Sequence, residues 1–304
     1  MKGTPISQDS HMPERIFVLP GLFDSADAAA IAHERRFLLA TGVRLGLAVL
    51  AAILAALAIL HHHEGLNYFG LGAAGAFTGA LIAEVWLISA EPENHWFENR
   101  AIAESVKTLS WRFAVGGLPY PLSSGDCIES LADDLENLVR EAHHLGPIAT
   151  IGSAVTSEMT QLRSAELGAR RDAFANLRVA DQQKWYFAKA RKIGYRAGAW
   201  RFVLIAVEIA GVLAGVATGF GYLHFDLTSI VSTALGSAVA WLAVKQHDSL
   251  SRSYASTSHE LALLTSRNRL HLVQAEDEWA RTVQNVEDLL AQEHSSWRAA
   301  RLIF

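Results

Sequence analysis

Residues 201–245 read RFVLIAVEIAGVLAGVATGFGYLHFDLTSIVSTALGSAVAWLAVK, and this stretch decides the fold. It holds an apolar run, Phe202–Tyr222, a short break, His224–Asp226, and a second apolar run, Leu227–Val244. Each run has about 20 residues, which is long enough for a helix to cross a hydrocarbon core of roughly 30 Å. The break is too short to fold separately, so we expect the two runs to form a transmembrane hairpin.

A similar pair of apolar runs, Gly42–Leu60 and Tyr68–Ala90, occurs earlier in the chain. Charged residues make up 19% of the 304 residues, but they are nearly absent from the four runs. Elsewhere the apolar residues recur three or four apart, which favours helices, and we find no convincing β-strand. The sequence therefore predicts an all-α integral membrane protein with two transmembrane hairpins, four spans and long cytosolic helices.

We divide the chain into a polar N-terminal segment, 1–20, and two units, 21–146 and 147–304. The first unit contains the hairpin 42–90, and the second contains the hairpin 202–244 and the C-terminal helices. The pair His11-Met12 is typical of a cloning junction before a native start at Met12, so residues 1–11 are left out of the fold reasoning.

Outside the hairpins the spacing of apolar residues predicts several further helices. Asp24 is a typical N-cap for a helix over Ala26–Arg36 that continues towards the first span. Further helices are expected over 96–116 and 128–139. Residues 148–201 contain no proline and are expected to form one long helix or two stacked ones.

Trp279, Val283, Val286, Leu290, Glu293 and Trp297 follow one another in steps of three or four residues. This heptad-like seam should pack on another helix, either in this chain or in a neighbouring subunit.

The hairpin loops, 61–67 and 224–226, contain no Lys or Arg. Basic residues lie on the opposite flanks: Arg35, Arg36, Arg44, Arg100, Lys107 and Arg112 for the first hairpin, and Lys184, Lys189, Arg191, Lys192, Arg196, Arg201, Lys245 and Arg252 for the second. Loops rich in Lys and Arg tend to stay in the cytosol. We therefore expect a multi-pass protein of the cell inner membrane, with both termini cytosolic and both hairpin loops outside.

Three sequence patterns lie beside the hairpins in the order that a known family shows. The first is Trp96-x3-Arg100-x2-Ala103-Glu104-x2-Lys107-x3-Trp111-Arg112, and the second is Asp181-Gln182-x2-Trp185-Tyr186-x2-Lys189-Ala190, followed near the end by Glu293-His294-x2-Trp297. They resemble the signatures of bacterial SLATT proteins, which are two-transmembrane effector domains associated with nucleotide-signalling systems. The chain looks like two such units in tandem, over roughly 20–145 and 165–300.

The resemblance implies an effector that forms pores or perturbs the membrane when an antiphage defence system is triggered, and that acts as a homo-oligomer. A nucleotide second messenger or a sensor protein would be the activator, although no fused sensor domain is recognisable. The alternative is a membrane-anchored scaffold or receptor whose cytosolic helices bind a partner.

Two carboxylates, Glu84 and Glu208, lie at similar depth, one in each hairpin. A carboxylate inside a membrane is costly unless it is paired, hydrated or neutral, and it marks a candidate functional site. In an oligomer, a ring of either residue could line an ion path. The structural alternative is an ion pair, between Glu84 and Arg44 or between Glu208 and Arg201 or a neighbouring helix.

Glycines recur every four residues in the second hairpin, at Gly211, Gly215 and Gly219, on the face that also carries Glu208. Gly75 and Gly79 form a shorter version in the first hairpin. Such faces let two helices approach closely, either within one chain or between subunits.

A basic belt precedes the second hairpin: Lys184, Lys189, Arg191, Lys192 and Arg196. Basic residues beside a span usually meet the headgroups of the lipid bilayer, and a docked nucleotide is the less favoured alternative.

The remaining patterns argue against other classes of function. The net charge of −5 does not favour nucleic acid as a partner. We find no nucleophile–base pair, P-loop or metalloprotease motif, and therefore expect neither an enzyme nor a bound cofactor. The adjacent histidines 61–63 are expected to cap the membrane surface rather than bind a metal.

Overall fold

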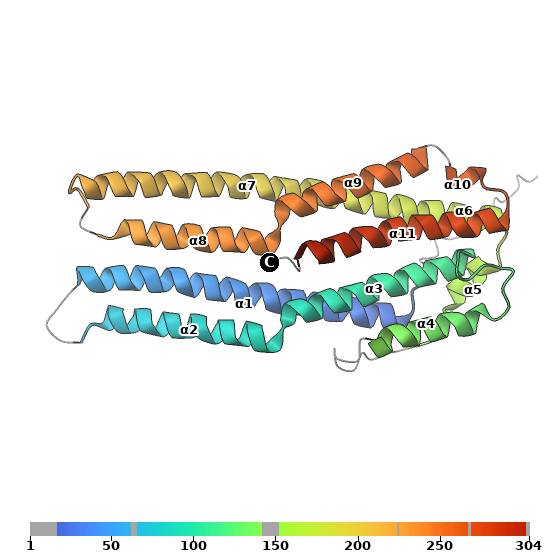
Figure 1. Ribbon diagram of the computed structural model, residues 1–304, viewed down its shortest axis with the longest axis horizontal. Coiled ribbons are helices and arrows are strands. Elements are labelled where there is room, and N and C mark those ends of the chain that lie inside the picture. The colour runs from blue at the N-terminus through green and yellow to red at the C-terminus, as the bar shows by residue number, and fades with distance from the viewer. Residues whose placement is uncertain (1–16, 62–65, 142–151, 224, 267–268, 302–304) are drawn as a thin grey trace, which may run out of the picture.

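The computed structural model describes residues 17–61, 66–141, 152–223, 225–266 and 269–301. These residues form helices joined by turns, and no strand occurs among them (Figure 1). Within these ranges, four helices are long and apolar enough to cross a membrane. The prediction of an all-α, multi-pass membrane protein is confirmed. Residues 1–11 and most of the histidine tract lie outside the described residues.

The first hairpin is made by α1 (Gly21–Leu60) and α2 (Tyr68–Ala90), and α3 (Pro92–Val115) follows it directly. The prediction of Asp24 as an N-cap is wrong, because α1 begins at Gly21 after Pro20 and Asp24 lies in its first turn. A proline just before the first turn fixes the chain direction without a side-chain cap. α1 therefore runs unbroken for 40 residues, about 60 Å, from the soluble end through the membrane span.

The second hairpin repeats this plan with α7 (Ala180–Gly219), α8 (Leu227–Lys245) and α9 (His247–Ser266). In both units a 40-residue helix forms the first span, and a shorter helix returns and then breaks at one residue. The breaks are Glu91 (φ 39°, ψ 45°) and Gln246 (φ 45°, ψ 38°), the two non-glycine residues of positive φ in the described part of the chain. Side chains disfavour this left-handed conformation by about 1–2 kcal/mol.

Shorter helices connect and complete the two units. α4 (Cys127–Glu141) follows α3, and α5 (Ser157–Arg163) leads to α6 (Leu167–Ala173). A six-residue π-helix (Phe174–Val179) joins α6 to α7 without interruption. Residues 152–201 therefore contain the short α5 and one long helical run that begins at Leu167, which is closer to the expected alternative of two helices than to that of a single one.

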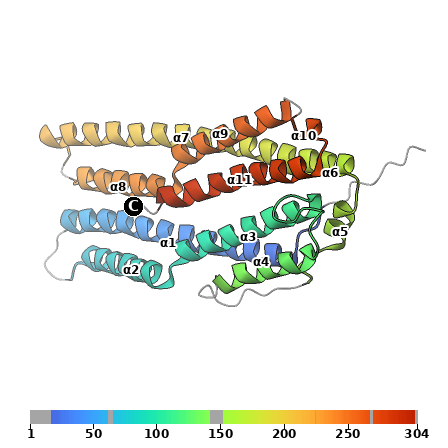
Figure 2. The ribbon, with the colours of Figure 1, turned by 45° about the vertical axis from the view of Figure 1, so that its right-hand side comes forward.

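α10 (Arg269–Leu272) and α11 (Glu276–Arg301) end the chain. Both views place α11 between α9 of its own unit and α3 of the first unit (Figure 2).

The four spans lie in a row in the order α7, α8, α1, α2 (Figure 1). α8 packs on α1, and a Cβ built at Gly42 of α1 would lie 3.7 Å from the ring of Trp241 of α8. Both hairpin turns are at one end of the molecule, and the polar helices gather at the other. The row leaves α2 and α7 as its two edges.

Two hydrophobic clusters hold the polar half together. One joins α1, α3, α4 and α5 around Val106, Phe113 and Leu131. The other joins α3, the π-helix, α9 and α11 around Trp111, Phe174 and Trp279.

The second cluster also decides where the predicted seam packs. Trp279, Val283, Val286 and Leu290 are buried within this chain, so of the two alternatives, packing on a helix of the same chain is the one observed for these residues. The side chains of Glu293 and Trp297 lie outside the described residues.

Candidate functional site

The first hairpin pairs its intramembrane charge within the chain. Arg44 of α1 donates to Glu84 of α2, so the two opposite charges that enter the membrane lie together. Their side chains keep 32% and 40% of their exposure. Pairing lowers the cost of placing a carboxylate in hydrocarbon. The Arg44–Glu84 alternative is thus the one observed, and a pore-lining role for Glu84 stays a prediction.

The second hairpin does not pair its carboxylate in this way. Glu208 lies exposed on α7, and the described residues provide it with neither a hydrogen bond nor an ion pair. The expected pair with Arg201 is not formed, because Arg201 donates to Asp248 of α9 at 2.5 Å. Glu208 therefore presents a carboxylate on the outside of an apolar helix.

The glycines are divided between packed and open positions. A Cβ at Gly211 would lie 3.2 Å from Val231 of α8, and one at Gly79 would lie 3.0 Å from Leu47 of α1. Cβ atoms at Gly75, Gly215 and Gly219 would meet nothing within 4 Å. Of the five predicted glycines, Gly79 and Gly211 thus serve packing inside their hairpins, and the other three face open space.

Glu208 belongs to the open part of α7. Gly215 and Gly219 follow it by seven and eleven residues, about two and three helical turns, which places all three on one face. α7 is an edge of the row of spans, so this face is available to another molecule.

The basic belt does not act as one surface. Lys189, Lys192 and Arg196 line a cavity between the two units, whereas Arg191 lines a groove between α7 and α9. Lys184 is exposed and lines neither of these. The structure therefore separates three of the five predicted residues from the other two.

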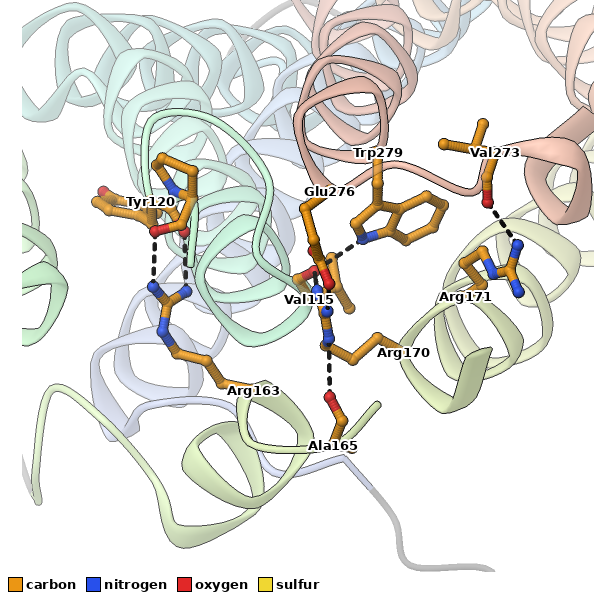
Figure 3. A network of polar contacts seen from close by, with 10 residues as sticks. Val115, Tyr120, Arg163, Ala165, Arg170, Arg171, Val273, Glu276 and Trp279 are labelled. Carbon is orange, nitrogen blue, oxygen red and sulfur yellow. Dashed lines mark hydrogen bonds and ion pairs between the residues drawn. The ribbon is translucent and has the colours of Figure 1, made fainter. Parts of the chain in front are cut away.

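Three arginines of the segment between the units bind backbone carbonyls (Figure 3). Arg163 donates to the carbonyls of Phe113 and Tyr120, at 2.7 and 2.8 Å. Arg170 donates to the carbonyl of Val115 at 2.8 Å and pairs with Glu276. The last carbonyls of a helix lack partners inside that helix, so the guanidinium groups of α5 and α6 supply them for α3.

The same segment also reaches the second unit. Arg171 donates to the carbonyls of His271 and Val273, at 2.9 and 2.5 Å. Trp279 of α11 donates its indole N–H to the carbonyl of Val115, which Arg170 also contacts. Figure 3 shows the contact of Arg171 with Val273 and those of Trp279 and Arg170 with Val115. Together they tie the end of α3 to α6 and α11.

A buried ion pair lies deeper in the same junction. Arg178 of the π-helix donates to both carboxylate oxygens of Glu287 of α11, at 2.8 and 2.6 Å, and both side chains are almost fully buried. Thr108 of α3 also donates to Glu287, at 3.1 Å. Burial opposes the charge of Arg178, but Glu287 outweighs it, so the pKa of Arg178 lies above its usual value.

Our sequence reasoning missed these arginines. Their spacing of seven and eight residues held no signal of a shared helix face, because the chain leaves the helical conformation between α5, which carries Arg163, and α6, which carries Arg170. Cys127, the single cysteine of the chain, is buried in α4. In the described part of the chain no three His, Cys, Asp or Glu residues come together as a metal site would require.

Comparison with known families gives two matches. The description "SMODS and SLOG-associating 2TM effector domain 3" (SLATT_3) matches residues 20–171, and the corresponding domain 1 (SLATT_1) matches residues 174–297. No curated protein and no solved structure matches the chain. Each matched range contains one hairpin and the helices that return from it. The chain therefore belongs to the SLATT family of two-transmembrane effector domains and carries two of them in tandem.

Proposed function

We propose that this tandem SLATT protein is a bacterial defence effector that assembles in the cell inner membrane and makes it permeable. The matched family models describe both domains as two-transmembrane effector domains. The observation that carries the proposal is the exposed, unpaired Glu208 on an edge helix. An acidic residue at the centre of a span costs about 2.5–3.5 kcal/mol on insertion scales. Glu208 lies six residues inside its apolar run, so its cost is smaller in degree but still favours a partner or water.

A single chain offers no channel, because its four spans form a row. Assembly can supply one. The edge helices α2 and α7 both carry open glycines, Gly75 on α2 and Gly215 with Gly219 on α7. In our proposal these edges meet between neighbouring copies, and a repeated head-to-tail contact closes into a ring. Glu208 would then line the path and favour cations.

The orientation follows the positive-inside tendency: both termini and the polar helices face the cytosol. A nucleotide second messenger or a sensor protein would reach the polar half there and trigger assembly. The proposal includes the lipid bilayer and further copies of the chain as partners, no nucleic acid, and no catalytic step.

Leakage of a dye from liposomes containing the purified full-length protein tests the proposal. We expect leakage from the wild type and a loss of most of it in Glu208→Gln, which removes the charge and keeps the shape. Glu129→Gln, at an exposed position of α4, is the matched control and should leak like the wild type. Growth arrest with membrane depolarisation on overexpression would agree with it.

Unchanged conductance in both Glu208→Gln and Glu84→Gln would contradict the ion-path assignment. Tight membrane anchoring without leakage, under conditions where the activator is present, would instead support a scaffold whose polar helices bind a partner.

A further inference from the structure

A cavity of about 320 Å³ lies between the two SLATT units, where the spans meet the polar helices. The first unit contributes α1 and α3 to its wall, and the second contributes α7, α8 and α9. The cavity is next to the ends of the apolar runs, since Val244 and Lys245 close α8 at its rim. It therefore lies at the height of lipid headgroups.

Basic side chains dominate one wall of this cavity. Lys189, Lys192 and Arg196 follow one another by three and four residues, so they project from one face of α7. All three are exposed in the free chain. Among the lining residues that the structure describes, the single carboxylate is that of Glu34.

The pKa of a neighbouring histidine is lowered by some of the same positive charges. His247 also lines the cavity. Burial lowers the pKa of His247, and the charges of Lys245 and Arg196 lower it further. Asp248 acts in the opposite direction, but burial and the two cations outweigh it, which agrees with the basic lining of the cavity.

Next to the basic residues, the lining is aromatic and apolar. The rings of Trp185 and Tyr254 lie 5.6 Å apart, and the ammonium group of Lys189 lies 5.3 Å from the centre of the Trp185 ring. Trp96 and Leu250 add apolar surface. Such a wall suits the glycerol backbone of a lipid or a flat ring, and tryptophan is common at this depth of a membrane.

We propose that this cavity binds a phosphate group of an anionic ligand, held by Lys189, Lys192 and Arg196 with its apolar part against Trp185 and Tyr254. Lysine and arginine are the usual partners of phosphate. A lipid headgroup and a soluble phosphate compound share this chemistry. These five residues belong to the second unit, and α1 and α3 of the first unit form the rest of the wall. A ligand that fills the cavity therefore also meets the first unit and stabilises one placement of the two hairpins relative to each other.

The test uses the full-length protein in detergent, with native mass spectrometry to count bound ligand. One arm adds phosphatidylglycerol, with phosphatidylcholine as the neutral reference, and the other adds ATP or inorganic phosphate. The variant is Lys189→Gln/Lys192→Gln/Arg196→Gln. The control is Lys184→Gln/Arg191→Gln/Arg252→Gln, which removes the same charge near the same membrane surface but outside the cavity.

We expect the cavity variant to bind the anionic ligand about tenfold more weakly or worse, since hydrogen bonds to charged groups are each worth roughly 1.5–3 kcal/mol. The control should stay within about twofold, because exposed charges contribute little individually. Loss in the phosphatidylglycerol arm alone identifies a lipid headgroup as the source, and loss in the ATP or phosphate arm identifies a soluble one.

Equal weakening in the cavity variant and the control would overturn the proposal, as would the absence of binding in both arms for the wild type. Far-ultraviolet circular dichroism checks that the triple variant is folded. Should it unfold, Arg196→Gln alone replaces it and must still weaken binding more than Arg252→Gln does.

Discussion

The two hairpins share one plan and differ in how they treat a charge. In the first, Glu84 is paired with Arg44 across α1 and α2. In the second, Glu208 is exposed on α7, and no described residue pairs with it. The first hairpin thus pairs its carboxylate internally and the second does not, although both hairpins carry open glycines. The two domains of the chain thus share a backbone plan and differ in how they pair an intramembrane charge.

The polar helices of the two units also differ, in how far the core of each unit depends on the other unit. The cluster of the first unit is built from its own helices and α5, but the cluster of the second unit includes Trp111 and Val115 of α3. α11 lies on α3 as well as on α9. The second unit therefore depends on the first for part of its core.

The largest effect is expected at this shared core. Arg178→Ala would leave Glu287 charged and buried without its partner, which typically costs about 3–5 kcal/mol. We expect a much lower Tm for the full-length protein in detergent. Arg140→Ala is the control, because Arg140 and Glu136 form an exposed pair of the kind worth about 0–1 kcal/mol. Equal Tm values for the two variants would show that the units do not depend on the buried pair.

The second largest effect is expected to distinguish Glu84, which is paired with Arg44, from Glu208, which has no partner among the described residues. Arg44→Leu strands Glu84 in the membrane, and we expect a loss of about 2–3 kcal/mol that shows as a lower Tm. Arg44→Leu/Glu84→Leu should recover most of it. Glu208→Leu should not destabilise the protein, since nothing described pairs with that residue. A loss of Tm in Glu208→Leu as large as that in Arg44→Leu would remove the contrast between the hairpins.

A smaller effect distinguishes the packed glycine from the open one. Gly211→Val would press on Val231 of α8, and overpacking of this kind costs about 1–3 kcal/mol. Gly215→Val meets no neighbour in the chain, so its Tm should match the wild type. Crosslinking in membranes should instead show fewer oligomers for Gly215→Val. Normal crosslinking in that variant would place the subunit contact elsewhere.

The smallest effect concerns pH. Burial, His95 and Arg36 lower the pKa of His33 in the first unit, and burial with two cations lowers that of His247 in the second. The folded protein then binds fewer protons than the unfolded chain near the usual pKa of about 6.5. Stability is present above that pH and is lost as the pH falls through and below it. Tm measured between about pH 7.5 and 5.5 should fall less in His33→Gln/His247→Gln than in the wild type, and parallel curves would contradict this.

Some parts of this structure were predictable from the sequence because they depend on composition over long windows. The bounds of α2 agree with the apolar run 68–90, since length and hydrophobicity suffice to define a span. The burial of Trp279 to Leu290 was predicted by their spacing, but the partner helix was not, because periodicity shows a face and not what covers it.

Other parts depend on contacts between distant residues. The pairing of Glu84 with Arg44 was one of two alternatives, and only the packing of α1 on α2 decides between them. The roles of Arg170 and Arg178 were missed because a polar stretch contains no signal for which arginine turns inward. The break at Glu91 had a local signal in Pro92, which disfavours a helical residue before it. The break at Gln246 had none.

Because of these two breaks, each hairpin has one helix that continues into the polar half and one that is interrupted at a single residue. α1 and α7 are each one continuous helix from the polar half into the span, so a displacement of the polar end would move the whole helix. α2 and α8 are coupled to the polar half through the two torsion angles of one residue, Glu91 or Gln246. A small change in these torsion angles would tilt α2 or α8 as a unit, while α1 or α7 stays in place. Each hairpin thus contains one candidate hinge residue, Glu91 or Gln246, directly after the end of an apolar helix.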